Sequence, residues 1–450
     1  MTTKRFLLAL ILCLAGGAAS LAGPYDFLAL DTLVDPSGGT WQTSSDTFLG
    51  EYGPYGFVWE SSAQDTARLA RPGMTFAGLP VVEALARFQD LRLAELTFSL
   101  YNRGDEKELS QEKFNDLVAS ADAKISAWAG SRAVEFPEED RTDFITVRRK
   151  AWVAGANRLD LAWSFTAKHN DPSLGPIPFR CEYVRLRVTP FDPAQDPRRL
   201  FQAPIINKTQ MLTILDLRRR VQHLPNGDVL IDTVPMVDQG PKGYCAAAVT
   251  ERVLRYFGAD VDQNDIAQAA NTTAANGTSP RAMMAALRQI GSEFHVQVNV
   301  LHEFKDNDFD RLIQDYNRLA RPAHRDPVSL NVAGSESVLD VVQGMDFDLY
   351  KQARARREAA RDDFQANVKQ SIDNGIPVVW SVVLGIVDET PPIHGFGGHM
   401  RLIIGYNDFT HQILYTDTWG AGHELKRMPL SDAWAITFGL YTIVPENVHL

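Results

Sequence analysis

Hydrophobic and polar residues alternate along much of the N-terminal half of the chain. In two segments every second residue is hydrophobic, namely Leu96, Phe98 and Leu100 in the first and Leu159, Leu161, Trp163 and Phe165 in the second. Successive side chains of a strand point to opposite faces of its sheet, so this alternation predicts half-buried strands. We therefore expect a β-rich N-terminal domain over residues 23–190.

One segment of this domain has the hydrophobic period of a helix. Between Gln111 and Trp128 the hydrophobic residues fall three or four positions apart, which predicts one amphipathic helix. Ser110 before it is a suitable N-cap, and Gly130 after it is a suitable stop. The domain contains no set of residues typical of catalysis. Its role is unknown, and we expect it to cover or to position a substrate cleft in the other half of the chain.

The chain changes character after this domain. Residues 189–204 are rich in proline and aspartate, which indicates a boundary, and we assign residues 191–224 to a linker. Asn226-Gly227 predicts a tight hairpin turn, because both residues tolerate positive φ. A second domain is expected over residues 225–450.

The second domain begins with helical patterns and ends with strand patterns. Helices are predicted from Cys245 to just before Gly258, over residues 263–270 and over residues 279–291. Residues 300–345 lack a clean period and residues 347–373 resemble a long exposed helix, so we expect an insertion at about 300–374. Hydrophobic strands are expected over residues 377–384, 401–406, 411–416 and 440–444. Helices followed by strands predict an α+β fold.

The first 22 residues have the pattern of a signal peptide. Lys4 and Arg5 precede an apolar run from Phe6 to Gly16, and small residues follow it. The apolar run is shorter than the ~20 residues that span a bilayer. We predict cleavage before Gly23, a secreted or periplasmic location, and no stable membrane span after the signal peptide is removed. The alternative is an uncleaved N-terminal anchor.

Composition narrows the classes of partner. The chain of 450 residues has a formal net charge of −11 and no basic cluster, which argues against nucleic acid as a partner. Two cysteines, Cys181 and Cys245, remain after cleavage at residue 22. They fall in different predicted domains, and we interpret Cys181 as a small buried hydrophobic residue of a strand, on the same face as Phe179 and Tyr183.

The second domain carries a set of residues suited to thiol chemistry. The sequence Q-G-P-K-G-Y-C runs from Gln239 to Cys245, where a helix is predicted to begin. Unpaired amides at a helix N-terminus favour an anion, so the pKa of a thiol there falls. The Gln239 amide and the Cys245 backbone N–H are candidates for two oxyanion donors.

Two further residues complete the set. His399 follows two glycines and opens a predicted strand, so it is a candidate base. Asp417 ends the next strand across a hairpin, where its carboxylate is expected to reach the distal ring nitrogen of His399. Trp419 is expected to shield that hydrogen bond from water.

These motifs resemble a known family. The segment from Gln239 to Cys245 is similar to the start of the papain-like cysteine peptidase core, and so are His399 with Gly405-Tyr406 and the sequence Asp417-Thr418-Trp419-Gly420. The details are most similar to the bacteriocin-processing peptidases, which cleave after double-glycine leaders and commonly have aspartate in the third catalytic position. The resemblance covers roughly residues 232–290 and 375–420.

The resemblance implies a papain-like C-terminal domain, with a helical part and an antiparallel β part, that hydrolyses a peptide or protein substrate. It implies Cys245 as the nucleophile, His399 as the base, Asp417 as the orienting group and Gln239 as the oxyanion donor. The chain departs from the family in two ways. Alanine follows the cysteine, and no transporter segments accompany the domain, so processing coupled to export is not expected.

Several alternatives stay open at this point. His394 is a rival base, and a zinc site built from His394, His399, His411, Asp417 and His423 has no helical ligand spacing, so we expect neither a metal nor another cofactor. The same thiol chemistry suits an amidase or an acyltransferase. The chain also fits a catalytically silent papain-like binding protein, or an enzyme that its N-terminal domain inhibits as a prodomain does.

Overall fold

The computed structural model describes residues 27–448 except 106, 141–144, 167–178, 193, 195–211, 271–294, 330–337 and 394. The predicted signal peptide and the predicted helix over residues 279–291 lie outside the described residues. The described part is a mixed α+β structure, with helices and antiparallel sheets. None of its helices has the length and apolar character needed to cross a membrane.

The N-terminal domain is built on a large antiparallel sheet. Its strands follow the order β2-β3-β6-β7-β12-β11-β10-β8, and β9 also pairs with β10. Their bounds are β2 Val58–Trp59, β3 Thr66–Leu69, β6 Glu83–Gln89, β7 Arg92–Asn102, β8 Val134–Glu135, β9 Glu139–Asp140, β10 Ile145–Ala154, β11 Asn157–Thr166 and β12 Arg180–Pro190. A small sheet of β1 Leu28–Ala29, β4 Met74–Phe76 and β5 Leu79–Val81 lies beside it. The alternating segments are strands, as predicted, but they are not half-buried, because both faces of β7 and β11 are largely covered.

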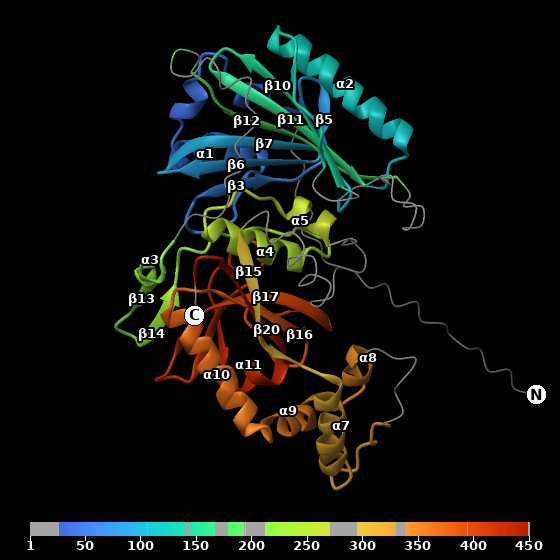
Figure 1. Ribbon diagram of the computed structural model, residues 1–450, viewed down its shortest axis with the longest axis vertical. Coiled ribbons are helices and arrows are strands. Elements are labelled where there is room, and N and C mark those ends of the chain that lie inside the picture. The colour runs from blue at the N-terminus through green and yellow to red at the C-terminus, as the bar shows by residue number, and fades with distance from the viewer. Residues whose placement is uncertain are drawn as a thin grey trace, which may run out of the picture.

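Helix α2 (Gln111–Ala129) covers one face of the large sheet (Figure 1). The Ser110 side chain accepts a hydrogen bond from Lys113 N, and Gly130 ends the helix at φ 64°, so both predicted caps are confirmed. The prediction of one helix was incomplete. A second helix, α1 (Ser45–Tyr52), is capped by Ser44, and its eight residues are too few to show a hydrophobic period. Short 3₁₀ turns η1 (Leu30–Leu33), η2 (Gly39–Gln42) and η3 (Gly53–Tyr55) flank it.

A second sheet organises the C-terminal half. Its strands follow the order β13-β14-β17-β16-β20-β15, and β18 pairs with β17 and β19. Their bounds are β13 Val221–His223, β14 Asp228–Ile231, β15 Val296–Glu303, β16 Val378–Leu384, β17 Gly397–Asn407, β18 Gln412–Thr416, β19 Lys426–Pro429 and β20 Thr437–Pro445. Gly227 has a φ of 89° in the turn between β13 and β14, so the predicted Asn-Gly hairpin is present.

The helices of this half are α3 Ile214–Arg218, α4 Cys245–Tyr256, α5 Gln263–Ala269, α7 Asp306–Ala320, α8 Val338–Gln343, α9 Phe347–Ala355, α10 Glu358–Asp373 and α11 Leu430–Ile436. Two expectations need correction here. The predicted linker, residues 191–224, includes α3 and β13, because Leu212 and Leu217 pack into the core of this half. The predicted insertion at 300–374 begins inside β15, whose last residues pair with β20 as part of the main sheet.

The stretch over residues 347–373 is also not one exposed helix. It divides into α9 and α10, and Tyr350, Phe364 and Val368 are buried. Helix α10 packs against β17, whereas α9 packs against α7 and α11. One charged residue of α9, Arg354, is buried and donates to Trp434 O and Thr437 O.

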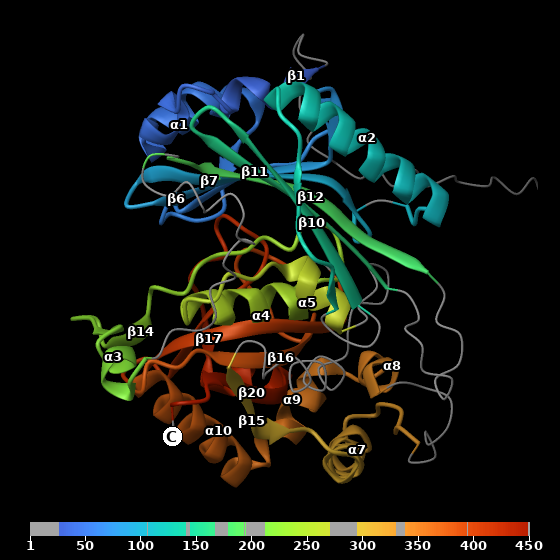
Figure 2. The same cartoon turned by 45° about the horizontal axis from the view of Figure 1, so that its top comes forward.

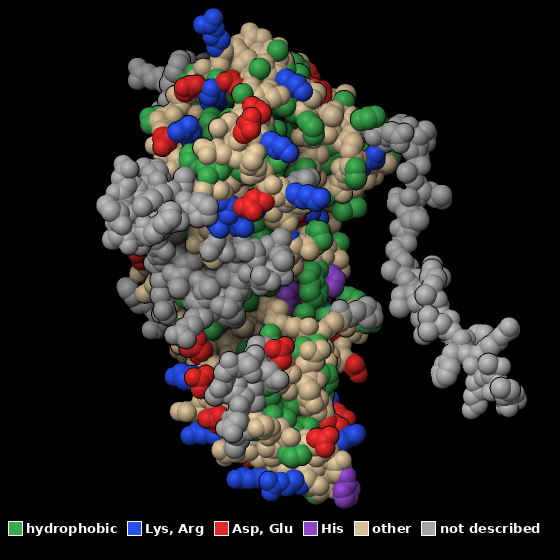
Figure 3. Space-filling view, turned by 90° about the vertical axis from the view of Figure 1, so that its right-hand side faces the viewer, with side chains coloured by type: hydrophobic (Ala, Val, Ile, Leu, Met, Phe, Trp, Pro, Cys, Tyr) green, Lys and Arg blue, Asp and Glu red, His purple; other side chains and the backbone are tan. Residues whose placement is uncertain are grey.

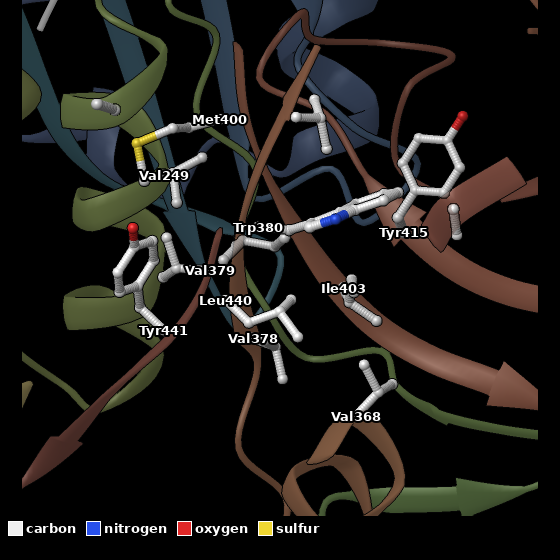
Figure 4. Packing of buried hydrophobic residues seen from close by; sticks show 14 of the residues in the cluster. Val249, Val368, Val378, Val379, Trp380, Met400, Ile403, Tyr415, Leu440 and Tyr441 are labelled. Atoms are coloured by element: carbon white, nitrogen blue, oxygen red, sulfur yellow. The ribbon is translucent and has the colours of Figure 1, made fainter. Parts of the chain in front are cut away.

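Helices α4 and α5 lie between the two large sheets (Figures 1 and 2). Helix α4 packs against β17, and α5 packs against β12 of the N-terminal domain. Trp380 of β16 is fully buried and contacts Tyr415 on the side of the sheet away from α4 (Figure 4). Figure 4 shows Val249 of α4 beside Met400 of β17, on the same side of the sheet as Val379. The first residues of α4 are thereby fixed against the beginning of β17, where the candidate site lies.

Candidate active site

Cys245 is the first residue of α4 and is partly exposed. The His399 side chain and the backbone groups of Ala246 and Met400 act on its thiol. Burial raises the pKa of the Cys245 thiol. His399 and the two backbone groups lower this pKa by more than burial raises it. The net pKa of Cys245 therefore lies below its ordinary value, and the thiolate is favoured.

His399 is buried near the start of β17. Its Nε2 atom lies 2.5 Å from Oδ1 of Asp417, so its other ring nitrogen is left for the thiol. Burial lowers the pKa of the imidazole, but the charge and hydrogen bond of Asp417, together with Cys245, raise it to about 9. This arrangement favours a thiolate–imidazolium pair.

Asp417 is itself fully buried just after β18. Burial raises the pKa of its carboxyl, whereas the charges of His399 and Arg401 and the His399 hydrogen bond lower it far below the ordinary range. The carboxylate is therefore ionised across the physiological range, as an orienting group for imidazolium must be.

Sequence analysis missed a group of charged residues behind Asp417. Fully buried Arg401 lies with Nε 3.0 Å from Oδ2 of Asp417 and with Nη2 3.0 Å from Oε1 of Glu389. Lys426 Nζ lies 3.1 Å from Oε2 of Glu389, and Tyr415 donates to the same oxygen at 2.5 Å. Two carboxylates thus alternate with two cations, so the buried charges compensate one another.

Gln239 is buried in the loop before α4. Its Nε2 donates to Lys242 O at 2.9 Å, and its Oε1 accepts a hydrogen bond of 2.6 Å from Thr418, the residue after Asp417. The Gln239 backbone N–H donates to Thr418 O at 2.9 Å. An amide nitrogen carries two hydrogens, so one remains for a substrate oxygen. These bonds fix the direction in which Gln239 presents it.

The aromatic ring of Trp419 lies over the histidine. The rings of Trp419 and His399 are stacked, with centroids 4.5 Å apart and planes 16° apart. His423 meets the same tryptophan edge-on at 5.4 Å. Figure 3 shows histidine and hydrophobic side chains together at mid-height on one face, where the upper and lower parts of the molecule meet.

The structure therefore brings Cys245, His399, Asp417, Gln239 and Trp419 into one site. The rival base His394 lies outside the described residues. His411 lies in the turn between β17 and β18 with a φ of 49°. Among the residues that the structure describes, no group of three or more His, Cys, Asp or Glu side chains is arranged to hold a metal ion.

Residues 342–439 match the model of the Peptidase_C39 like family. The match supports a C39-type, and thus cysteine-type, peptidase domain in the C-terminal half. It begins at α8 and includes His399 and Asp417, whereas Gln239 and Cys245 precede it. No curated protein matches the chain.

The family match also bears on the predicted insertion. Helices α9 and α10 fall within the matched residues, so the match overlaps the predicted insertion from residue 342 onward. The hydrophobic pattern of these helices is interrupted by many charged residues, and this pattern was the reason for the prediction.

Arg252, which the sequence analysis also missed, connects helix α4 to Asp417. Arg252 of α4 is buried, and it donates to Asp417 O at 2.6 Å, Thr416 Oγ1 at 2.8 Å and Pro235 O at 2.7 Å. It follows Cys245 by seven residues, so both lie on the same side of the helix. That spacing was the one signal in the sequence that could have pointed to Arg252.

Proposed function

We propose that this chain is a papain-like cysteine peptidase with Cys245 as nucleophile, His399 as base and Asp417 as orienting group. One observation carries the proposal. His399 contacts the Cys245 thiol with one ring nitrogen and lies 2.5 Å from Asp417 with the other. The peptidase-family match over residues 342–439 supports the same reading.

The reaction follows from this geometry. The Cys245 thiolate attacks the carbonyl carbon of the scissile amide, and the carbonyl oxygen becomes an oxyanion. The Gln239 side-chain N–H and the Cys245 backbone N–H donate to that oxyanion. His399 then gives its proton to the leaving amine, and the C–N bond breaks to leave an acyl-thioenzyme. Water, deprotonated by His399, hydrolyses the thioester and releases Cys245.

Asp417 and Trp419 act through His399 in this scheme. Asp417 keeps the imidazole in one orientation and stabilises its charged form. Trp419 covers the ring and limits the access of water to the His399–Asp417 hydrogen bond, which strengthens that bond.

The first test is the pH dependence of Cys245 alkylation by iodoacetamide, mapped by mass spectrometry. We expect rapid labelling well below pH 8 in the wild type, because the pKa of Cys245 is lowered by His399. In His399→Ala the labelling should shift to the pH range of an ordinary thiol, near ~8.5. Equal profiles in the two proteins would sink the proposal and favour a silent binding protein.

The same protein then identifies the reaction class. A peptide library is incubated with the wild type and with Cys245→Ala, and the products are identified by mass spectrometry. Peptide fragments formed only by the wild type support a peptidase. Products from cell-wall or other non-peptide amides, without peptide cleavage, would point to an amidase or acyltransferase.

A further inference from the structure

The loop before the nucleophile is held from outside its own domain. Residues 238–244 connect Pro235 and its neighbours to α4, and they carry two charged side chains, Asp238 and Lys242. Both side chains form ion pairs with residues of the N-terminal domain. The loop that presents Gln239 is therefore contacted by both halves of the chain.

Lys242 makes the more direct link. Its side chain is completely buried, and Nζ lies 2.8 Å from Oδ2 of Asp105, which follows β7. Asn102 also donates to Oδ2 of Asp105 at 2.9 Å. The carbonyl of Lys242 accepts the Gln239 amide at 2.9 Å. One residue thus holds the Gln239 side chain with its backbone and anchors itself in the N-terminal domain with its ammonium group.

Asp238 makes a second link, at the other end of the loop. Its Oδ2 lies 3.2 Å from Nη1 of Arg68 in β3, and Arg68 Nε lies 2.7 Å from Glu83 in β6. Its Oδ1 accepts a hydrogen bond of 2.8 Å from Gly240 N. A side chain at Gly240 would bring its Cβ 3.0 Å from Arg68 Nη2, so the loop and the N-terminal domain approach one another closely.

Each of these two contacts includes a buried charged side chain, Lys242 in one and Glu83 in the other. The side chains of Lys242 and Glu83 are 0% and 7% exposed, and charges taken from water are retained only where they are paired. Removing one partner leaves the other charge buried without compensation. Separating the two domains would therefore release the loop as well.

We propose that the N-terminal domain permanently positions residues 238–244, the loop that presents Gln239 to the oxyanion, and that it is not a removable cover of the active site. Lys242, Asp105 and Arg68 are positioning residues, and they act on catalysis through Gln239. The inference rests on the proposed function, because it assigns a role to this domain in the same site. It predicts that the intact two-domain chain is the active form.

The test uses point variants of the full chain. We expect Lys242→Met and Asp105→Asn to lower kcat by about 10- to 100-fold, since a misplaced oxyanion donor affects the transition state more than the ground state. KM should stay within about threefold. Asp105→Glu, which keeps the charge, should recover most of the activity. The charge of Glu83 also acts on Lys242, so Lys242 keeps an anionic neighbour in Asp105→Asn, and this variant should fold even where Lys242→Met does not.

Two controls separate loop positioning from general effects. Lys150→Met makes the same substitution at an ion pair with Asp122 inside the N-terminal domain. Arg185→Met weakens the contact between the domains at Asp265 of α5, away from the loop. Both should keep a kcat close to that of the wild type, provided that their thermal unfolding temperatures remain above the assay temperature.

Hydrogen–deuterium exchange gives a readout that needs no substrate. The Gln239 and Gly240 amides are hydrogen-bonded to Thr418 O and Asp238 Oδ1, so they should exchange faster in Lys242→Met while α4 stays protected. Unchanged kcat and unchanged loop exchange in both variants would overturn the inference. A failure of the proposed function is seen separately, because it appears in the wild type and His399→Ala alkylation profiles, which involve none of these variants.

Discussion

The histidine is the residue on which the site depends electrostatically. His399 is buried, and burial alone would keep it neutral. Asp417 and Cys245 reverse this effect and raise its pKa to about 9. Asp417 can do so because Arg401 and Lys426 hold it as an anion, and Glu389 in turn balances those two cations. The charge of the imidazolium is thus supported by residues that do not touch it.

Asp417→Asn should therefore narrow the active pH range from both sides. Without the carboxylate the His399 pKa falls, so the alkaline limb of the rate profile moves down from about pH 9, and low-pH labelling of Cys245 weakens. The loss of kcat should be about 10- to 100-fold smaller than that of Cys245→Ala, because an orienting group matters less than the nucleophile. The measurement is the pH dependence of kcat/KM and of alkylation.

The matched control is Asp408→Asn, at an exposed carboxylate in the turn between β17 and β18. It should change neither limb. A profile of Asp417→Asn that overlays the wild type would show that the carboxylate does not set the pKa of His399.

Sequence alone could assign residues to helices and strands where the pattern of neighbouring residues determines the local structure. The helix at Cys245 and the strands around His399 follow from hydrophobic period and from glycine positions. Arg401 and Glu389 could not be found in this way, because they come from different segments and their pairing is a property of the fold. Cys181 is buried and packs in the same core as Phe179, as predicted, but the prediction that Tyr183 shares their face was wrong for a similar reason. A register shift beside Phe165 lets Cys181 join the core under α2, while Tyr183 donates to Asp265 at 2.6 Å on the other side.

Helix α4 is the element that connects the site to the rest of the molecule. Its hydrophobic residues pack on the second sheet, and Glu251 and Arg252 are buried as well. Arg87 of the N-terminal domain forms an ion pair with Glu251. Arg87 belongs to another domain, so no pattern within the helix revealed that Glu251 would be buried.

Arg252→Met should destabilise this element. Three acceptors, Pro235 O, Asp417 O and Thr416 Oγ1, lose their donor, and each buried acceptor left without a partner costs ~1 kcal/mol or more. We expect a loss of about 3 kcal/mol in the free energy of unfolding. Arg252→Lys should recover little of it, because one ammonium group cannot replace the planar fork of a guanidinium.

The measurement is thermal unfolding, monitored by circular dichroism, with Arg311→Met as the control. Arg311 is an exposed arginine of α7, and its loss should leave the unfolding temperature nearly unchanged. If Arg252→Met unfolds at the wild-type temperature, then the link between α4 and the segment at Asp417 does not stabilise the fold.

At the scale of the whole molecule, the described residues of the two domains meet through partly buried ion pairs and not through a shared hydrophobic cluster. The hydrophobic residues form two separate clusters, one in each domain. Between them lie ion pairs such as Arg187 with Asp260 and Arg185 with Asp265. Such an interface is specific in its geometry but sensitive to pH, because a change in one charge alters the balance of its neighbours.

Glu60 is the group at this interface whose protonation should matter most. It faces Asp238, Glu251, Arg255 and Arg68, and Asp238 N donates to it at 3.4 Å. Burial, followed by the charge of Asp238, raises the pKa of Glu60 to about 8. Its unfolded value is near ~4.3. Between these two values the folded protein binds more protons than the unfolded chain, so this group lowers stability as pH rises from about 4.5 to 8.

Glu60→Gln should remove that contribution, since glutamine keeps the acceptor for Asp238 N but does not ionise. We expect the stability advantage of the variant over the wild type to be small at pH 5 and to grow by about 4 kcal/mol between pH 5 and pH 9, since each pH unit between the two pKa values contributes ~1.4 kcal/mol. Calorimetry at both pH values measures the difference. A stability difference that is the same at both pH values would mean that Glu60 is already ionised in the folded protein. Arg68 and Arg255 would then balance the buried charges. In that case the protonation of Glu60 would not make the contact between the N-terminal domain and residues 238–244 depend on pH.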